Sequence, residues 1–428
     1  MKSTKTWIGI RDNFWLVPAI YGIIAIVSVV GLNALDSWLI AAYTKEIPQL
    51  LLTSQETAKS LYASLVTAIL TMTTISFSVI MVVLTTYSMQ FSPRTLQDFM
   101  RSRVTHHVLG VFSFGFIFAL TYLLLSGENR TILGPIMMTM VAICCLGFFI
   151  YFIHHSARLV QVNQLIKKIH ADGNQVISHA FRGREFNEHE TWEGKDIEQI
   201  KEQSGYELTA NGPGYIQSIN WKPLVKWAKE KDIAVELKIQ TGDYVFKDVP
   251  VAKIVGTDSE TASKKLHNHI VIGNERTDIQ DVEFLLEKLV EIAVMAISPA
   301  KNDPHTASNS INRIGSLLAR LGKEYREARY LSDKDGELRV IARPKRYEDY
   351  LYKSFYQIKH YNNDDVSIYF SMIEVLYKVA LVSEETIQRK IWDFHHYIIE
   401  AIDWESLQKT DREYLQEIYD KFLSIYDS

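Results

Sequence analysis

A run of hydroxyl side chains inside a long apolar segment is the part of this sequence best suited to chemistry in a membrane. Between Ser60 and Pro93 the chain has no Asp, Glu, Lys, Arg or His. Ser and Thr recur there at steps of three, four or seven, which places them along one face of a helix. Met81 occupies one position of that pattern. This hydroxyl stripe comprises Thr67, Thr71, Thr74, Ser78, Met81, Thr85 and Ser88.

The stripe has two interpretations, and the sequence leaves both open. Hydroxyl oxygens can replace part of the hydration shell of an ion, and a ring of Met81 side chains could form a hydrophobic constriction. One four-helix chain is too small to enclose a water-filled path, so a pore requires a homo-oligomer around a permeant ion or solute. Alternatively, each hydroxyl bonds the carbonyl four residues back, and the stripe is a packing seam between helices.

A second polar group lies in the last third of the chain. Several carboxylates near loop and helix ends could bind a cation or act in acid–base chemistry. We favour a structural interpretation, in which Asp278 and Asp281 cap and charge one helix N-terminus and either Asn302 or Asp303 caps the next. Arg276 would then pair with a buried acid. The candidate cytoplasmic cluster comprises Glu275, Arg276, Asp281, Asn302 and Asp303.

Motifs for enzymatic chemistry are missing from the sequence. We find no phosphate-binding loop, dinucleotide fingerprint, kinase signature, hydrolase elbow or HExxH motif. The two cysteines, Cys144 and Cys145, are adjacent and cannot form a disulfide framework or a zinc site. We therefore expect no enzymatic activity, cofactor or metal. The net charge of −4, with no clustered basic arm, also gives no reason to expect nucleic acid as a partner.

The elements that carry the stripe form a membrane domain. Four apolar segments in the first third of the chain are each long enough to cross a bilayer. They cover residues Phe14 to Leu35, Ser60 to Pro93, Val104 to Leu125 and Thr131 to Ile153. The outer loop is expected from Asp36 to Lys59.

Basic residues set the expected orientation. Arg94, Arg101 and Arg103 lie between the second and third segments, and further basic residues precede the first and follow the fourth. The positive-inside rule then places both termini in the cytoplasm of a bacterial inner membrane. At the inner mouth of a pore these three arginines would slightly favour anions, but the topology explains them equally well.

The sequence after residue 157 predicts a cytoplasmic α/β region. A helix from Arg158 to His179 and a linker lead to a β-rich module that resembles the half-repeat of barrel-sandwich hybrid domains, the fold of biotinyl and lipoyl carriers. The carrier lysine at a hairpin tip is missing, since Lys253 lies within a predicted strand. Mainly helical sequence follows. The expected domains are 1–157 (membrane), 158–204 (helix and linker), 205–273 (β-rich module) and 274–428 (helical).

Three motifs resemble an uncharacterised bacterial membrane protein family, a domain of unknown function (DUF2254). The motifs are Tyr87-Ser-Met-Gln-Phe-Ser-Pro-Arg94, Glu275-Arg-Thr-Asp-Ile-Gln-Asp281 and Ser298-Pro-Ala-Lys-Asn-Asp-Pro304. The resemblance covers most of the chain and implies four transmembrane helices with a cytoplasmic domain, but no activity. Our leading hypothesis is an oligomeric channel lined by residues 60–93 and gated by the cytoplasmic domain. The alternative is a non-conducting sensor or scaffold whose cytoplasmic domain binds a partner or small ligand.

Overall fold

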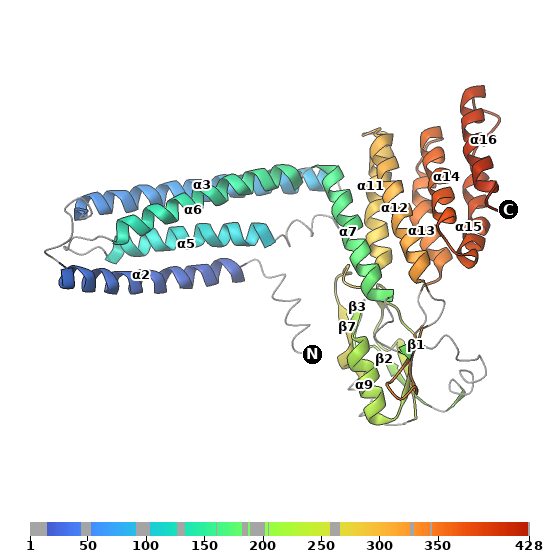
Figure 1. Cartoon of the computed structure of the whole chain (residues 1–428), viewed down its shortest axis with the longest axis horizontal. Coiled ribbons are helices and arrows are strands. Elements are labelled where there is room, and N and C mark those ends of the chain that lie inside the picture. The colour runs from blue at the N-terminus through green and yellow to red at the C-terminus, as the bar shows by residue number, and fades with distance from the viewer. Residues whose placement is uncertain are drawn as a thin grey trace. The chain divides into compact units, whose positions relative to one another are not determined.

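The chain folds into two compact units that divide near residue 162. The structure is a computed structural model, and its first unit contains four long helices while its second contains the sheets and the remaining helices (Figure 1). The residues it describes are 15–43, 53–90, 103–125, 133–159, 161–181, 187–188, 202–203, 205–256, 266–325, 329–342 and 345–426.

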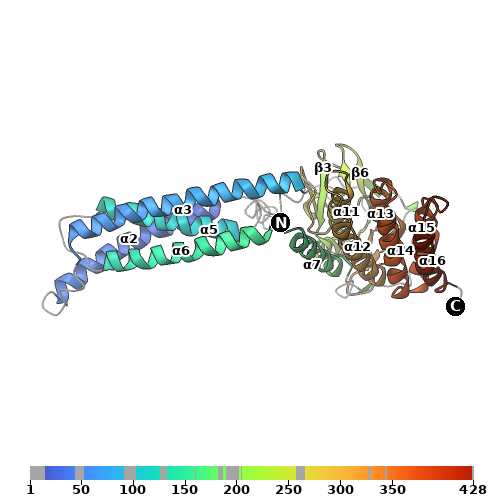
Figure 2. The same ribbon diagram turned by 90° about the horizontal axis from the view of Figure 1, so that it is seen from above.

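Four helices lie side by side in the first unit (Figures 1 and 2). Each is long and apolar enough to cross a membrane, which confirms the four predicted spans. The helices are α2 (Leu16–Tyr43), α3 (Gln55–Gln90), α5 (Arg103–Leu125) and α6 (Leu133–Leu159).

Three boundaries of the long helices differ clearly from the sequence prediction, and one of them is the end of α6, at Leu159 and not Ile153. Helix α2 does not end at Leu35 but continues to Tyr43, so the predicted outer loop is shorter. Helix α3 begins at Gln55 rather than Ser60 because the Ser54 hydroxyl accepts a hydrogen bond from the Thr57 amide at 3.3 Å, as an N-cap does. Pro93, the predicted end of this helix, lies outside the described residues.

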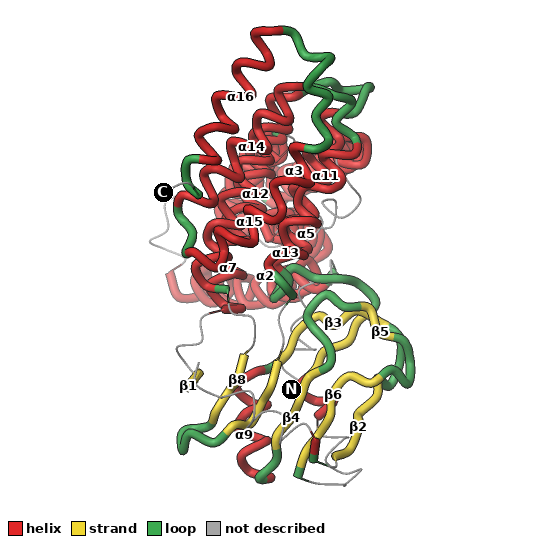
Figure 3. The backbone as a smooth tube through the Cα atoms, turned by 90° about the vertical axis from the view of Figure 1, so that its right-hand side faces the viewer, coloured by secondary structure: helices red, strands yellow, loops and turns green. Residues whose placement is uncertain are grey.

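The second unit sets a row of helices beside a β-rich module (Figures 1 and 3). Most of these helices follow residue 281, in the part of the chain predicted to be mainly helical. The helices are α7 (Val162–Phe181), α9 (Trp221–Lys231), α11 (Val282–Ile297), α12 (Pro304–Glu324), α13 (Tyr347–His360), α14 (Val366–Leu381), α15 (Glu385–Ile399) and α16 (Lys409–Leu423).

The strands form two sheets. A six-stranded sheet has the order β1-β8-β9-β4-β6-β2, and a three-stranded sheet has the order β5-β3-β7. All pairings are antiparallel except that of β4 with β9. The strands are β1 (Asn187–Glu188), β2 (Gly205–Thr209), β3 (Gly214–Ile219), β4 (Ala234–Leu237), β5 (Tyr244–Val245), β6 (Pro250–Val255), β7 (Ile270–Gly273), β8 (Arg329–Ser332) and β9 (Leu338–Ala342).

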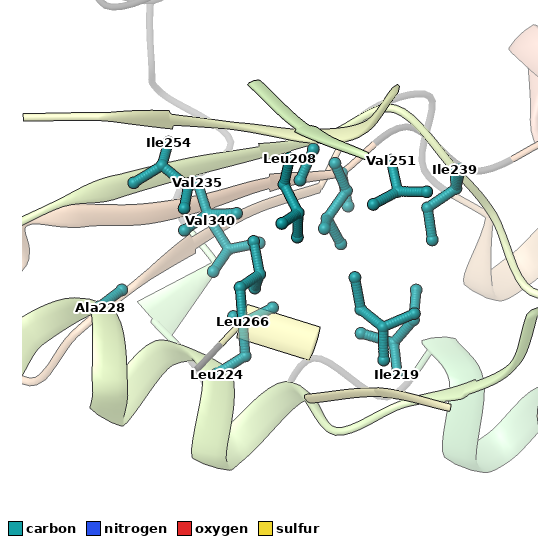
Figure 4. Packing of buried hydrophobic residues seen from close by; sticks show 14 of the residues in the cluster. Leu208, Ile219, Leu224, Ala228, Val235, Ile239, Val251, Ile254, Leu266 and Val340 are labelled. Atoms are coloured by element: carbon teal, nitrogen blue, oxygen red, sulfur yellow. The ribbon is translucent and has the colours of Figure 1, made fainter. Parts of the chain in front are cut away.

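The core of the β-rich module lies between the larger sheet and the elements that cover it. Leu208 and Val235 project from the sheet toward Leu224 of α9 and Ile219 of β3 (Figure 4). Lys253 lies within β6, opposite Glu207 of β2 and Glu236 of β4. It is therefore a strand residue, as predicted, and not the tip of a carrier hairpin.

Candidate functional site

The hydroxyl stripe lies on the face of α3 opposite the one that packs. Tyr62, Ile69, Ser76 and Val83 recur every seven residues and are buried in the first unit. The stripe positions lie two residues before and after the buried ones: Thr67 and Thr71 flank Ile69, Thr74 and Ser78 flank Ser76, and Met81 and Thr85 flank Val83. Two residues correspond to about 200° around a helix, so the stripe lies on the opposite side. The stripe side chains from Thr67 to Thr85 are accordingly exposed on the four-helix unit.

The stripe hydroxyls donate to their own helix. The Thr67, Thr74 and Ser78 hydroxyls donate to the carbonyls four residues earlier, at 3.1, 3.0 and 3.1 Å. Thr71 and Thr85 do the same at 2.8 Å each. Because the proton is directed inward, each side chain presents the lone pairs of its oxygen outward. The local bonds predicted by the packing interpretation are therefore present.

Apolar side chains flank the stripe on both sides. Leu70 and Phe77 on one side and Ile75 and Val82 on the other are 43 to 64% exposed. Within the stripe, Met81 is 62% exposed and interrupts the hydroxyls. The result is a narrow polar line on an otherwise apolar surface.

The inner-mouth residues are not positioned by the structure. Arg94 and Arg101 lie outside the described residues. Arg103 begins α5, and Ser88 lies in the last turns of α3, but the side chains of both also lie outside the described part.

A buried acid in the first unit was missed by the sequence analysis. The sequence analysis placed Asp36 at the start of an outer loop. In the structure it lies in α2, is 3% exposed, and accepts a 3.4 Å hydrogen bond from the Leu133 amide at the start of α6. Tyr62 and Tyr122 are also buried, with ring centroids 5.5 Å apart, and Tyr62 lies against Gly134 of α6. The carboxylate therefore caps α6 and joins it to α2.

The second unit brings Arg276 to the N-terminus of α11. Its guanidinium donates to Asp281 at 2.6 Å, to Glu283 at 3.0 Å and to Glu287 at 3.0 Å. Asp281 also caps α11 by accepting from the Phe284 amide at 3.0 Å. Arg276 is 14% exposed and Asp281 2%, so the pairing is shielded from water. This confirms the predicted cap and the predicted buried pair.

Three further charged groups extend this Arg276 network. The Lys345 ammonium lies 3.1 Å from Glu283 and 4.0 Å from Asp243. Lys353 lies 3.8 Å from Glu283. A Cβ on Gly242, which has φ 92°, would collide with Asp281, so the turn from Gln240 to Asp243 reaches the network only because residue 242 is glycine.

Burial and neighbouring charges set the protonation of these groups. Burial raises the pKa of Asp243, with Glu283 and Asp281 adding to the rise and Lys345 opposing it. Burial alone would raise the pKa of Glu283, but Lys345 and Arg276 outweigh it and the pKa is lowered. At neutral pH, Glu283 is therefore held ionised between cations.

The predicted cytoplasmic cluster is not a single site. Asp303 caps α12 by accepting from the Thr306 amide at 3.1 Å, and Asn302 has a left-handed backbone with φ 48°. Both follow the C-terminus of α11, whereas Arg276 and Asp281 lie at its N-terminus, 16 residues of helix away. Glu275 contributes its backbone carbonyl, which accepts from the Gln217 side chain at 2.7 Å. The cluster was wrong as a unit because capping residues at opposite ends of one helix cannot meet.

In the part of the chain that the structure describes, no group of three or more His, Cys, Asp and Glu side chains could hold a metal ion. The Arg276 network is a set of charges paired with one another. Neither it nor the hydroxyl stripe combines a nucleophile with a base.

Comparison with known proteins places the chain in a family. A family model described as "Predicted membrane protein (DUF2254)" matches residues 11–378. The chain belongs to this family. Uncharacterised proteins of Mycobacterium tuberculosis and Mycobacterium bovis are 24% identical to it over 321 residues, covering 72% of this chain and 60% of each relative. The match thus spans about three fifths of the length of these curated relatives. No solved structure shows a significant match.

Proposed function

We propose that this DUF2254 protein is an oligomeric ion or small-solute channel, in which copies of α3 surround a polar path and the cytoplasmic unit gates it. The observation that carries the proposal is the position of the hydroxyl stripe. It is exposed on the four-helix unit, directly opposite the face of α3 that packs. The proposal requires this arrangement, because one face of α3 must pack within its own four-helix unit while the opposite face lines an axis shared with other copies.

The chemistry of the stripe suits a path for partly hydrated ions or small polar solutes. Each hydroxyl proton from Thr67 to Ser78 is used on a carbonyl of α3, so the oxygen is free to accept from water or contact a cation. The stretch from Ser60 to Pro93 has no charged side chain. Met81 would form the narrow apolar ring of such a path.

The proposal includes the orientation inferred from the basic residues. Both termini and the second unit lie in the cytoplasm of a bacterial inner membrane, and α3 enters the cytoplasm near Arg94. The protein is assigned no enzymatic activity in this scheme.

A second candidate is a non-conducting sensor or scaffold in which the stripe joins copies without water between them. The hydrogen bonds to carbonyls four residues back favour it, because they satisfy each hydroxyl without any solvent. In that case the cytoplasmic unit would bind a partner or ligand, and the membrane unit would hold copies together.

Flux through purified protein in liposomes separates the two candidates. Thr74→Val removes one stripe hydroxyl with little change in shape. The matched control is Thr73→Val, since Thr73 makes the same bond at 2.8 Å but is partly buried on the other side of α3. The channel predicts ion or solute flux that falls in Thr74→Val and persists in Thr73→Val, with the oligomer intact in both. Folded protein without flux, or equal flux in the two variants, would refute it.

A further inference from the structure

The helix that follows the last membrane span is docked on α12 of the second unit by an ordered line of polar contacts. Helix α7 begins at Val162, directly after α6 ends at Leu159. Asn163 bonds Asn309 at 2.9 Å, His170 bonds Ser316 at 3.0 Å and Asn174 bonds Arg320 at 3.2 Å. All three pairs are 146 residues apart, so α7 and α12 run parallel in one fixed register.

Apolar packing supports the same docking. Leu165, Ile166, Ile169 and Ile177 of α7 are buried, and Gly173 lies against Leu317 of α12. A Cβ on Gly173 would approach Leu317 to 2.9 Å, which shows how close the two helices come. The polar line runs along the edge of this apolar contact.

His170 is the titratable group in the middle of that line. Its Nε2 lies 3.0 Å from the Ser316 hydroxyl, and the Asn174 amide nitrogen lies 3.3 Å from the ring. The same amide nitrogen lies 3.4 Å from Nδ1, so it lies against the ring and not on a single lone pair. Its partly positive hydrogens favour a neutral ring over a protonated one.

Two arginines of α12 lie one turn before and one turn after Ser316. Arg313 and Arg320 both act electrostatically on the ring, and together with burial, the largest effect, they hold the pKa of His170 below its ordinary value. Arg320 also donates to Asn174 and Ser178 of α7 and lies 3.7 Å from Glu324. On α7 itself, the cation one turn earlier is the exposed Lys167. A proton on His170 would add a positive charge to this cationic edge.

We propose that His170 makes the docking of α7 on α12 pH-dependent, so that acid loosens α7, the helix that follows the last membrane span, from the rest of the second unit. The docked form favours neutral histidine. Its stabilisation is complete above the pKa of undocked histidine, about 6.5, and is lost progressively as the pH falls below that value. This device is independent of conduction.

Hydrogen exchange of the full-length protein in nanodiscs tests the proposal. Exchange is compared at pH 7.5 and pH 5.5 after correction for the intrinsic rates. We expect the protection of α7 amides to fall severalfold at the lower pH. Amides of α14 serve as the internal reference. His170→Gln, which cannot gain a charge, is expected to remove the pH dependence.

His305→Gln is the matched control, because His305 is exposed in the first turn of α12, 11 residues before Ser316. It is expected to keep the wild-type response. If His170→Gln folds poorly, His170→Asn provides the same comparison. Protection of α7 that is equal at both pH values in the wild type would overturn the proposal, as would an undiminished fall in the His170 variants.

Discussion

Arg276 shows what one buried side chain can hold together. Its guanidinium contacts Asp281, which caps α11, and two acids on the first turns of the same helix. Glu283 in turn reaches Lys345, from the segment before α13, and Asp243 from the β-rich module approaches the same lysine. A buried cation with several acidic partners is strongly destabilised when one partner is removed. At this scale, the network is a structural junction between the module and the helices.

Asp243 provides a prediction about pH. Its pKa is raised by burial and by the nearby acids, so the folded state favours the protonated carboxyl. Such a group stabilises the fold below its unfolded pKa, and that contribution is lost as the pH rises through the folded-state value. Asp243→Asn should therefore stabilise the second unit at neutral pH, with the gain fading below about pH 4. Urea unfolding at a series of pH values measures this.

Asp248→Asn is the control for that comparison. Asp248 is exposed in the neighbouring turn and has φ 66°, a conformation that asparagine tolerates. Its substitution should leave the pH profile unchanged. A loss of stability in Asp243→Asn at neutral pH would show that the pairing with Lys345 dominates.

Local sequence predicted the helices and their caps because the signals lie within one or two turns. Asp281 was identified as a cap residue, and the second cap was assigned to either Asn302 or Asp303. The caps form at Asp281 and Asp303. The start of α3 was misplaced because the apolar pattern was followed and the Ser54 cap was overlooked. Asp36 was misread for a different reason. Its burial depends on Leu133, 97 residues away, and no local pattern reports such a contact.

The two caps lead to a prediction about α11 and α12. Asp281→Ala removes a cap and also a partner of the buried Arg276, which keeps Glu283 and Glu287. We expect the free energy of unfolding to fall by about 3 kcal/mol. Asp303→Ala removes only an exposed cap and should cost about 1 kcal/mol. Urea unfolding of the full-length variants, followed by tryptophan fluorescence, compares them. Equal losses would mean that Arg276 contributes nothing beyond the cap.

At the scale of the whole molecule, the sequence predicted four spans and a cytoplasmic-like region of helices and small sheets, as the structure has them. The sequence did not predict which strands pair with one another. Strands β2 and β3 are consecutive in the chain, but they enter different sheets because β2 pairs with β6 whereas β3 pairs with β5 and β7. The hydroxyl stripe was readable from spacing alone. That it faces away from its own unit depends on how α3 packs against α5 and α6.

Water access along α3 tests the channel proposal most directly. Single cysteines are placed at Thr67, Thr71, Thr74 and Ser78, and at the flanking positions Leu70, Ile75 and Phe77, after Cys144 and Cys145 are replaced by serine. A small, water-soluble and membrane-impermeant thiol reagent is then applied to the protein in liposomes. The proposal predicts rapid modification at the four stripe positions and little at the three flanking ones. Unreactive cysteines at all stripe positions in folded protein would contradict it and identify the stripe as a dry seam.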